Sequence, residues 1–167
     1  MSVFPARILL STDGSEDAEL VMTTAVGLTK ITGSELYVVT VFPESAYVYA
    51  YYTARRLEGV EQYQREARMV LDAQVKKIEG LGTTVAGARL RTGDVAEEIV
   101  KLADELGVGL IAVGSRGRGR IRRMLIGSVS DSVVRHAHCP IMVVRRKPVI
   151  FPAKILLATD GSEGAAQ

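Results

Sequence analysis

Short apolar runs alternate along this chain with longer stretches whose apolar residues recur at helical spacing. The short runs are rich in aliphatic and β-branched residues, which is typical of strands. They occupy residues 7–11, 35–42, 83–91, 110–113 and 141–144. The longer stretches repeat apolar residues every three or four positions, as amphipathic helices do. They run from Glu16 to Gly33, over 63–80, from Asp94 to Leu106 and over 128–137.

This alternation predicts an α/β fold in which a five-stranded parallel sheet carries helices on both faces. The run 110–113 contains no polar residue, as expected of a parallel strand that is covered on both sides. Ligands of such sheets bind beyond the carboxyl ends of the strands. We therefore expect a binding site among two polar loops that follow strands, residues 11–15 and 114–130.

The end of the chain repeats its beginning. Residues 3–16 read VFPARILLSTDGSE and residues 150–163 read IFPAKILLATDGSE, so eleven of the fourteen positions are identical. A repeat at a fixed offset indicates duplicated units. We interpret residues 1–147 as one complete domain and residues 148–167 as the first strand and turn of a second. This last strand has no sheet of its own, so it is either a piece of a tandem protein or docks on a neighbouring subunit.

Composition and charge favour an ordinary globular domain. Hydrophobic residues make up 47% of the chain, and no apolar run reaches the roughly 20 residues that span a bilayer. A net charge of +2 is too small to favour nucleic acid or a membrane as partner. The single cysteine, Cys139, excludes an internal disulfide and fits a reducing compartment. Because the start shows no secretory signal, we expect a cytoplasmic protein.

The loop after the fourth strand combines glycine, arginine and serine in the string GSRGRGRIRRMLIGSVS, residues 114–130. Gly114 and Gly117 let the main chain approach a ligand without a Cβ in the way. Gly127 and Ser128 begin a helix, whose free N–H groups and positive dipole end favour a phosphate. The hydroxyls of Ser128 and Ser130 can donate to phosphate oxygens. The arginines that supply forked donors for an anion are Arg116, Arg118, Arg120, Arg122 and Arg123.

The simpler alternative is that the glycines make turns and the arginines form a solvated surface. Three glycines in phase with a strand end and a helix start favour anion binding over that alternative. The chain has no GxxxxGK[ST] string and no GxGxxG after its first strand. The sequence therefore predicts neither a Walker P-loop nor a dinucleotide fingerprint.

The string G-x2-G-x9-G-S, which starts at Gly114, resembles the nucleotide-binding signature of the universal stress proteins. The segments ILLSTDGSE, RTGDVAEEIVKLADELGVGLIAVGSRG and SVVRHAHCPIMVVR resemble the same family, so the resemblance covers residues 5–146. It implies a Rossmann-like sheet of the adenine nucleotide alpha hydrolase type, with strand order 3-2-1-4-5. It also implies ATP or another adenine nucleotide as the ligand. We expect Mg²⁺ to accompany a triphosphate, because this ion usually binds through substrate phosphates and one or two carboxylates.

The resemblance assigns parts of the nucleotide to particular residues. Those at the ends of the first two strands would contact adenine and ribose, and they are Ser11, Thr12, Asp13 and Val41. Val113, at the end of the fourth strand, would pack under the base or ribose, and Gly114 and Gly117 would pass near ribose and phosphate. Those at the following helix start would hold the phosphates, with Arg116 beside them, and they are Gly127, Ser128, Val129 and Ser130. Ser11 departs from the proline or valine that is common at its position in the family.

Some of these polar residues also have simpler explanations. Asp13 can cap the following helix instead of binding a ligand, and the two roles can coexist. His136, His138 and Cys139 are metal-ligand types, but three donors without a second cluster lead us to predict no metal site. The tyrosines in the connection after the second strand would form a lid, an interface or a cover for the sheet end. They are Tyr47, Tyr49, Tyr51 and Tyr52.

We predict a nucleotide-binding module that acts in stress response through nucleotide-dependent conformation or dimerisation, without catalytic residues. Phosphoryl transfer needs a held metal and a positioned nucleophile, and Asp13 and Asp131 do not form a pair at a fixed spacing. A slow ATPase of the same superfamily is the alternative, and a scaffold with a vestigial site is a third. The resemblance implies a homodimer through an edge strand at Ile141–Val144, or a pseudo-dimer with a second repeat.

Overall fold

The structure is a computed structural model and describes residues 4–45, 48, 57–117 and 126–145, with the backbone alone at 57–60. The repeated tail at 148–167, the tyrosines between 47 and 52, and the arginines from Arg118 to Arg123 lie outside these residues. What the sequence predicts for those segments therefore stays a prediction.

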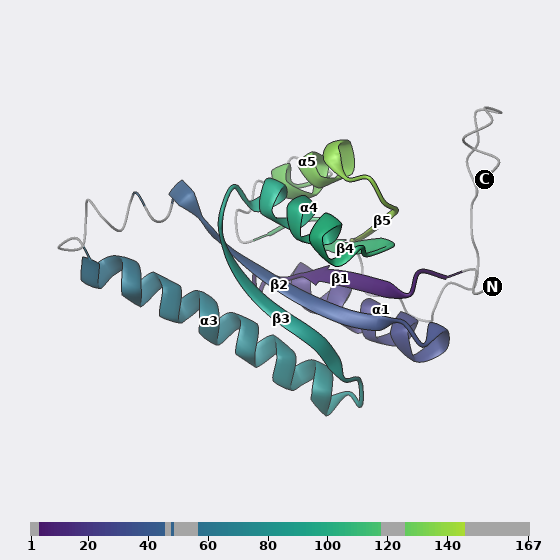
Figure 1. Cartoon of the computed structure of the whole chain (residues 1–167). Coiled ribbons are helices and arrows are strands. Elements are labelled where there is room, and N and C mark those ends of the chain that lie inside the picture. The colour runs from purple at the N-terminus through teal and green to yellow at the C-terminus, as the bar shows by residue number, and fades with distance from the viewer. Residues whose placement is uncertain (1–3, 46–47, 49–56, 118–125, 146–167) are drawn as a thin grey trace.

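Strands and helices alternate along the described chain. They are β1 (Arg7–Ser11), α1 (Glu16–Thr32), β2 (Glu35–Pro43), α3 (Leu57–Gly80), β3 (Val85–Gly93), α4 (Val95–Leu106), β4 (Leu110–Gly114), α5 (Ser128–His136) and β5 (Ile141–Val144). The strands form one five-stranded sheet in the order β3-β2-β1-β4-β5, and every neighbouring pair is parallel. Helices α1 and α3 cover one face, and α4 and α5 cover the other (Figure 1). The predicted fold class and strand order are confirmed.

One strand lies two residues later than the sequence pattern predicts. The pattern places the third strand at 83–91, whereas β3 spans Val85–Gly93. The N–H of Thr83 donates to the carbonyl of Ile78 at 3.3 Å, so Thr83 closes the turn after α3. The ladder to β2 therefore begins only at Val85, opposite Leu36.

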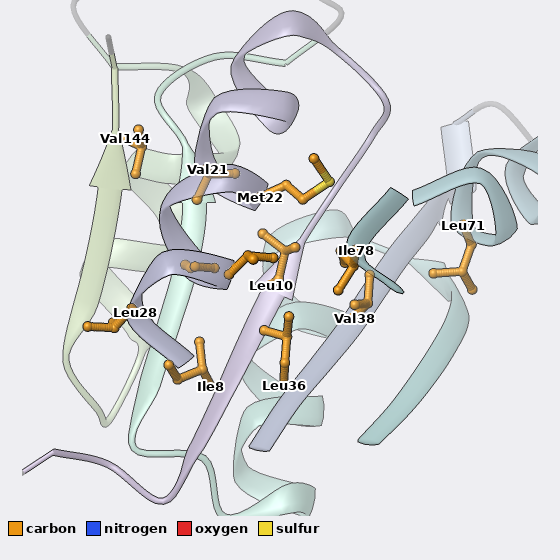
Figure 2. Packing of buried hydrophobic residues seen from close by; sticks show 13 residues of the cluster. Ile8, Leu10, Val21, Met22, Leu28, Leu36, Val38, Leu71, Ile78 and Val144 are labelled. Atoms are coloured by element: carbon orange, nitrogen blue, oxygen red, sulfur yellow. The ribbon is translucent and has the colours of Figure 1, made fainter. Parts of the chain in front are cut away.

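The core has two layers because successive residues of the central strands point to opposite faces of the sheet. Ile8 and Leu10 of β1 belong to the cluster under α1 and α3, and Leu9 belongs to the cluster under α4 and α5. All three side chains are completely buried. Figure 2 shows the first cluster, in which the side chains of Leu10 and Val38 lie between α1 and α3.

Helix α3 joins α1 through a polar contact at the edge of the core. The buried Gln74 donates from Nε2 to Oε1 of Glu19 at 2.8 Å, and Lys77 forms an ion pair with the same carboxylate. This contact fixes the two helices side by side on their face of the sheet. None of the helices in the described part of the chain is long and apolar enough to cross a membrane.

Candidate functional site

The two polar loops follow neighbouring strands, so the sheet brings them together. Strand β1 pairs with β4 in the register Ile8 to Leu110, and β2 and β3 lie on its other side. The winding direction therefore reverses between β1 and β4, where open α/β sheets bind their ligands. A Cβ added to Gly117 would lie 2.6 Å from Oδ2 of Asp13, so the loops touch at this point.

Asp13 holds the turn between β1 and α1. Its Oδ1 accepts the N–H of Ser15 at 2.9 Å. Ser15 in turn is the N-cap of α1 and accepts the N–H of Ala18 through its side chain. Asp13 therefore does accept a local backbone hydrogen bond. This bond stabilises the turn before α1 and does not cap the first amides of the helix. The second carboxylate oxygen, Oδ2, faces Gly117.

The other residues predicted at the first strands have contacts inside the protein. Thr12 is buried and continues the ladder beyond β1, because its N–H donates to the carbonyl of Val39 at 2.9 Å. Ser11 ends β1 and is half-buried. Val41 lies half-buried near the end of β2, and Val113 is buried near the end of β4. Both valine side chains pack into the cluster under α4 and α5. The backbone of Val113 pairs with β5 opposite Val143, whereas Val41 lies beyond Val39, the last residue of β2 that pairs with β1.

The glycines permit close packing of the loops on the protein itself. A Cβ on Gly114 would lie 3.1 Å from the carbonyl carbon of Asp17 in α1. One on Gly127 would lie 3.2 Å from the carbonyl oxygen of Ser115 and 3.3 Å from Cα of Arg116. The reason for glycine at these two positions is therefore contact with neighbouring backbone. Gly117 faces a carboxylate oxygen of Asp13 and so lies where the two loops meet.

The start of α5 differs from the starts of α1 and α4. Asp94 caps α4 by accepting the N–H groups of Ala96 and Glu97, and Ser15 caps α1. Gly127 is the N-cap of α5 and provides no side-chain acceptor. The first helical amides, of Ser128, Val129 and Ser130, have no partner among the described residues. Such amides are the groups that bind phosphate at a helix start.

Serine and arginine side chains complete this end of the sheet. The hydroxyl of Ser130 is buried and donates to the carbonyl of Gly114 at 2.6 Å, so its proton is engaged within the protein. Ser130 can then offer a ligand its backbone N–H and not its hydroxyl. Arg116 is half-buried, and its Nε has no hydrogen-bond partner within the described chain. Asp131 pairs with Arg135 one turn along α5.

Sequence reasoning missed two residues at this site, Ser115 and Asp17. The hydroxyl of Ser115 donates to Oδ2 of Asp17 at 3.0 Å, which links the loop after β4 to the first turn of α1. Ser115 is only 1% exposed. The sequence signal for Ser115 was its place between the end of an apolar strand and the second glycine of the motif. Such a position becomes buried when the loop packs against a helix.

Two other features lie away from this junction. Nδ1 of His136 lies 2.7 Å from the carbonyl of Ser132, and the described residues contain no group of three or more metal-ligand side chains. A groove of about 560 Å³ lies between α4 and α5 and contains none of the predicted site residues. The candidate site therefore rests on the loop and helix-start geometry and not on a cavity.

Fold and site define a class: a doubly wound α/β protein whose polar loops meet an uncapped helix where the sheet reverses direction. The universal stress protein family matches residues 6–145. A relative from Staphylococcus haemolyticus that is named as a universal stress protein is 34% identical over 145 residues, 86% of each chain. The chain belongs to the universal stress protein family.

Solved structures agree with this assignment. Universal stress protein UspA from Lactobacillus plantarum is 27% identical, with a TM-score of 0.71 over 84% of this chain and 97% of that one. Two other structures with the fold hold nucleotides. One is a universal stress protein in complex with cAMP, 21% identical with a TM-score of 0.63 over 83% and 95%. The other, from Archaeoglobus fulgidus in complex with dAMP, is 24% identical with a TM-score of 0.62 over 85% and 98%.

Proposed function

We propose that this protein binds an adenine nucleotide, ATP with Mg²⁺ in the first instance, where the ends of β1 and β4 meet the start of α5. The observation that carries the proposal is the α5 N-terminus, whose cap residue Gly127 supplies no side-chain acceptor. Its first amides and the helix dipole suit phosphate oxygens. The same fold holds cAMP and dAMP in two other proteins, which makes adenine the base to test first.

Each part of the nucleotide has a group of matching chemistry. The amides of Ser128–Ser130, the Ser128 hydroxyl and the guanidinium of Arg116 suit the phosphates. The carboxylate of Asp13 suits ribose or adenine donors, and the backbone at Val41 suits the adenine edge. The described carboxylates form no group that could hold a metal alone. Mg²⁺ would therefore bind mainly through the phosphates, neutralising part of their charge.

The proposed role is a signalling module in stress response, in which the nucleotide favours one conformation or one assembly. A ligand shifts such an equilibrium only by binding the two states with different affinity. Incubation of the purified protein with ATP separates this role from slow hydrolysis. A module leaves ATP intact over hours at room temperature, whereas a slow ATPase accumulates ADP.

Thermal unfolding with nucleotide tests the binding itself. A specific ligand raises Tm, since it stabilises the native state by about 2.7 kcal/mol at a hundredfold excess over Kd. We expect ATP with Mg²⁺ to raise Tm for the wild type and to lose most of this effect in Gly117→Val, whose side chain would displace Asp13. Gly80→Val is the matched control, because a Cβ there meets nothing within 4 Å. If ATP, AMP and cAMP all left the wild-type Tm unchanged, the binding proposal would be wrong and the protein would be a scaffold with a vestigial site.

We also propose that β5 forms a homodimer interface, or the equivalent interface with a second repeat. Strand β5 is at an edge of the sheet, and an open edge pairs readily with another strand. The carbonyls of Pro140 and Val144 accept N–H groups from Ile111 and Ser115 at the β4 side. Because residues alternate along a strand, the N–H of Val143 faces the open edge.

Proline at this position tests the edge directly. Val143→Pro removes the outward N–H without removing a β4 hydrogen bond, so we expect it to shift a dimer toward monomer in analytical ultracentrifugation. Val143→Ala keeps the N–H and controls for the lost side chain. A sedimentation profile that proline leaves unchanged would place the interface elsewhere.

A further inference from the structure

We propose that Asp17 and Ser115 are positioning residues that set the affinity for the nucleotide phosphates by fixing the start of α5 against α1. The inference rests on the proposed nucleotide binding and deepens it. Both side chains act through other groups, namely the amides at the start of α5 and the turn that carries Asp13.

Ser115 connects three elements through its three polar groups. Its N–H donates to the carbonyl of Val144 in β5 at 2.8 Å, and its carbonyl accepts the N–H of Gly127 at 2.7 Å. Its hydroxyl donates to Oδ2 of Asp17 at 3.0 Å. Since the residue is buried, each of these groups would be costly to leave without a partner. The position of Ser115 therefore fixes the position of Gly127, the N-cap of α5.

Asp17 provides the other half of the pair. It lies in the first turn of α1, two residues after the N-cap Ser15. Its backbone also contacts the loop, because a Cβ on Gly114 would lie 3.1 Å from its carbonyl carbon. The turn that begins this helix is held by Asp13. A charge-assisted hydrogen bond from Ser115 to Asp17 thus links the loop after β4 to the first turn of α1, which directly follows the turn that Asp13 holds.

The consequence for binding is preorganisation. A row of amides binds an anion best when its position is fixed before the ligand arrives, because no ordering cost is then added on binding. Without the hydroxyl bond to Asp17, the carbonyl that holds Gly127 can shift with its loop. The amides of Ser128–Ser130 would move with it, so the affinity for a phosphorylated ligand should fall.

Calorimetric titration with ATP and Mg²⁺ tests the pair in the full chain. We expect Ser115→Ala and Asp17→Ala each to weaken binding about tenfold, because about 1.4 kcal/mol of ordering cost would then be added to the binding step. The double variant should be no weaker than either single variant, because both changes remove the same bond. Asp17→Asn retains an oxygen that accepts from Ser115, so it should stay within about threefold of the wild type.

Ser34→Ala is the matched control, since its hydroxyl donates to the carbonyl of Pro5 at 2.6 Å, beside the start of β2 at the other end of the sheet. Single variants that bind ATP as well as the wild type overturn the inference, as do losses that add up in the double variant. Binding that tightens in Asp17→Asn also overturns it, because charge repulsion would then be the main effect. If Asp17→Ala does not fold, the ATP affinities of Ser115→Ala and Asp17→Asn still test the inference. A wild type that binds no ATP overturns the proposed function and the inference together, whereas wild-type binding with unaffected variants overturns the inference alone.

Discussion

The carboxylate of Glu19 accepts hydrogen bonds from Gln74 and Lys77, and so joins α1 to α3. Partial burial on its own would raise the pKa of Glu19. The hydrogen bonds from Lys77 and Gln74 and the charge of Lys77 outweigh burial, and hold this pKa below its ordinary value of 4.5. Such a carboxylate stabilises the fold above its unfolded pKa and loses this contribution as pH falls through the folded pKa.

Substitution of Glu19 should therefore have a pH-dependent effect. We predict that Glu19→Gln lowers Tm at pH 7, and that its Tm approaches that of the wild type as pH falls from about 5 to about 3. Thermal unfolding followed by circular dichroism measures both curves. Glu79→Gln, at an exposed position on α3, is the control. A difference between wild type and Glu19→Gln that stays constant with pH would contradict the prediction.

The thiol of Cys139 should be protected in the folded protein. Burial, helped by the charge of Asp104 and opposed by a backbone hydrogen bond from Ile111, raises the pKa of this thiol above its ordinary value of 9.0. Since the thiolate is the reactive form, we expect iodoacetamide at pH 8 to modify the native protein more slowly than the protein in urea. Mass spectrometry over time gives both rates, and equal rates would refute the expectation.

Two glycines, one inside α1 and one at its C-terminal end, should respond to alanine in opposite directions. Gly33 ends the helix with φ of 72° and donates to the carbonyl of Thr29, so Gly33→Ala should cost about 1 kcal/mol. Gly27 lies inside the helix and a Cβ there meets nothing within 4 Å, so Gly27→Ala should stabilise by about 0.5–1 kcal/mol. Urea unfolding measures the two values, and each variant serves as the control for the other. If both variants changed the free energy of unfolding in the same direction, the left-handed conformation at Gly33 would not be what makes glycine favourable there.

Most elements could be predicted because each has a local signal. The run at 110–113 is apolar throughout since β4 is covered on both faces, and Gly33 stands where the helix must end in a left-handed residue. The start of β3 could not be predicted in the same way. It depends on a hydrogen bond that keeps Thr83 in the turn and on the register with β2, and neither leaves a trace in the apolar pattern.

At the scale of the whole molecule, the two core layers should be equally necessary. Leu9 and Leu10 are both fully buried, on opposite faces of β1. We predict that Leu9→Ala and Leu10→Ala each lower the free energy of unfolding by about 2–5 kcal/mol, the cost of a cavity in a packed core. Ile31→Ala, at a side chain that is 67% exposed, should change it by less than about 0.5 kcal/mol. Chemical unfolding measures all three, and a tolerated change at Leu9 would mean that the α4 and α5 layer is loosely packed.

The candidate site could be located from the sequence but not resolved into roles. If β1 and β4 are parallel neighbours, the polar loops that follow them must lie at the same edge of the sheet, beyond the carboxyl ends of the strands. The contacts that decide individual roles join distant residues, such as Asp17 with Ser115 and Gly114 with Ser130. The Ser130 hydroxyl therefore holds the loop and does not serve as the predicted donor to the ligand, and no local pattern marks Asp17.

The central place of β1 has a consequence for how the chain is made. Among the described strands it is synthesised first, yet one of its two sides pairs with β4, which is synthesised much later. Until then, β2 and β3 can join it on one side while its other side stays open and apolar. A nascent chain halted before Leu110 would carry a half-sheet with an open, apolar edge, so this domain should depend on chaperones mainly until β4 has been synthesised.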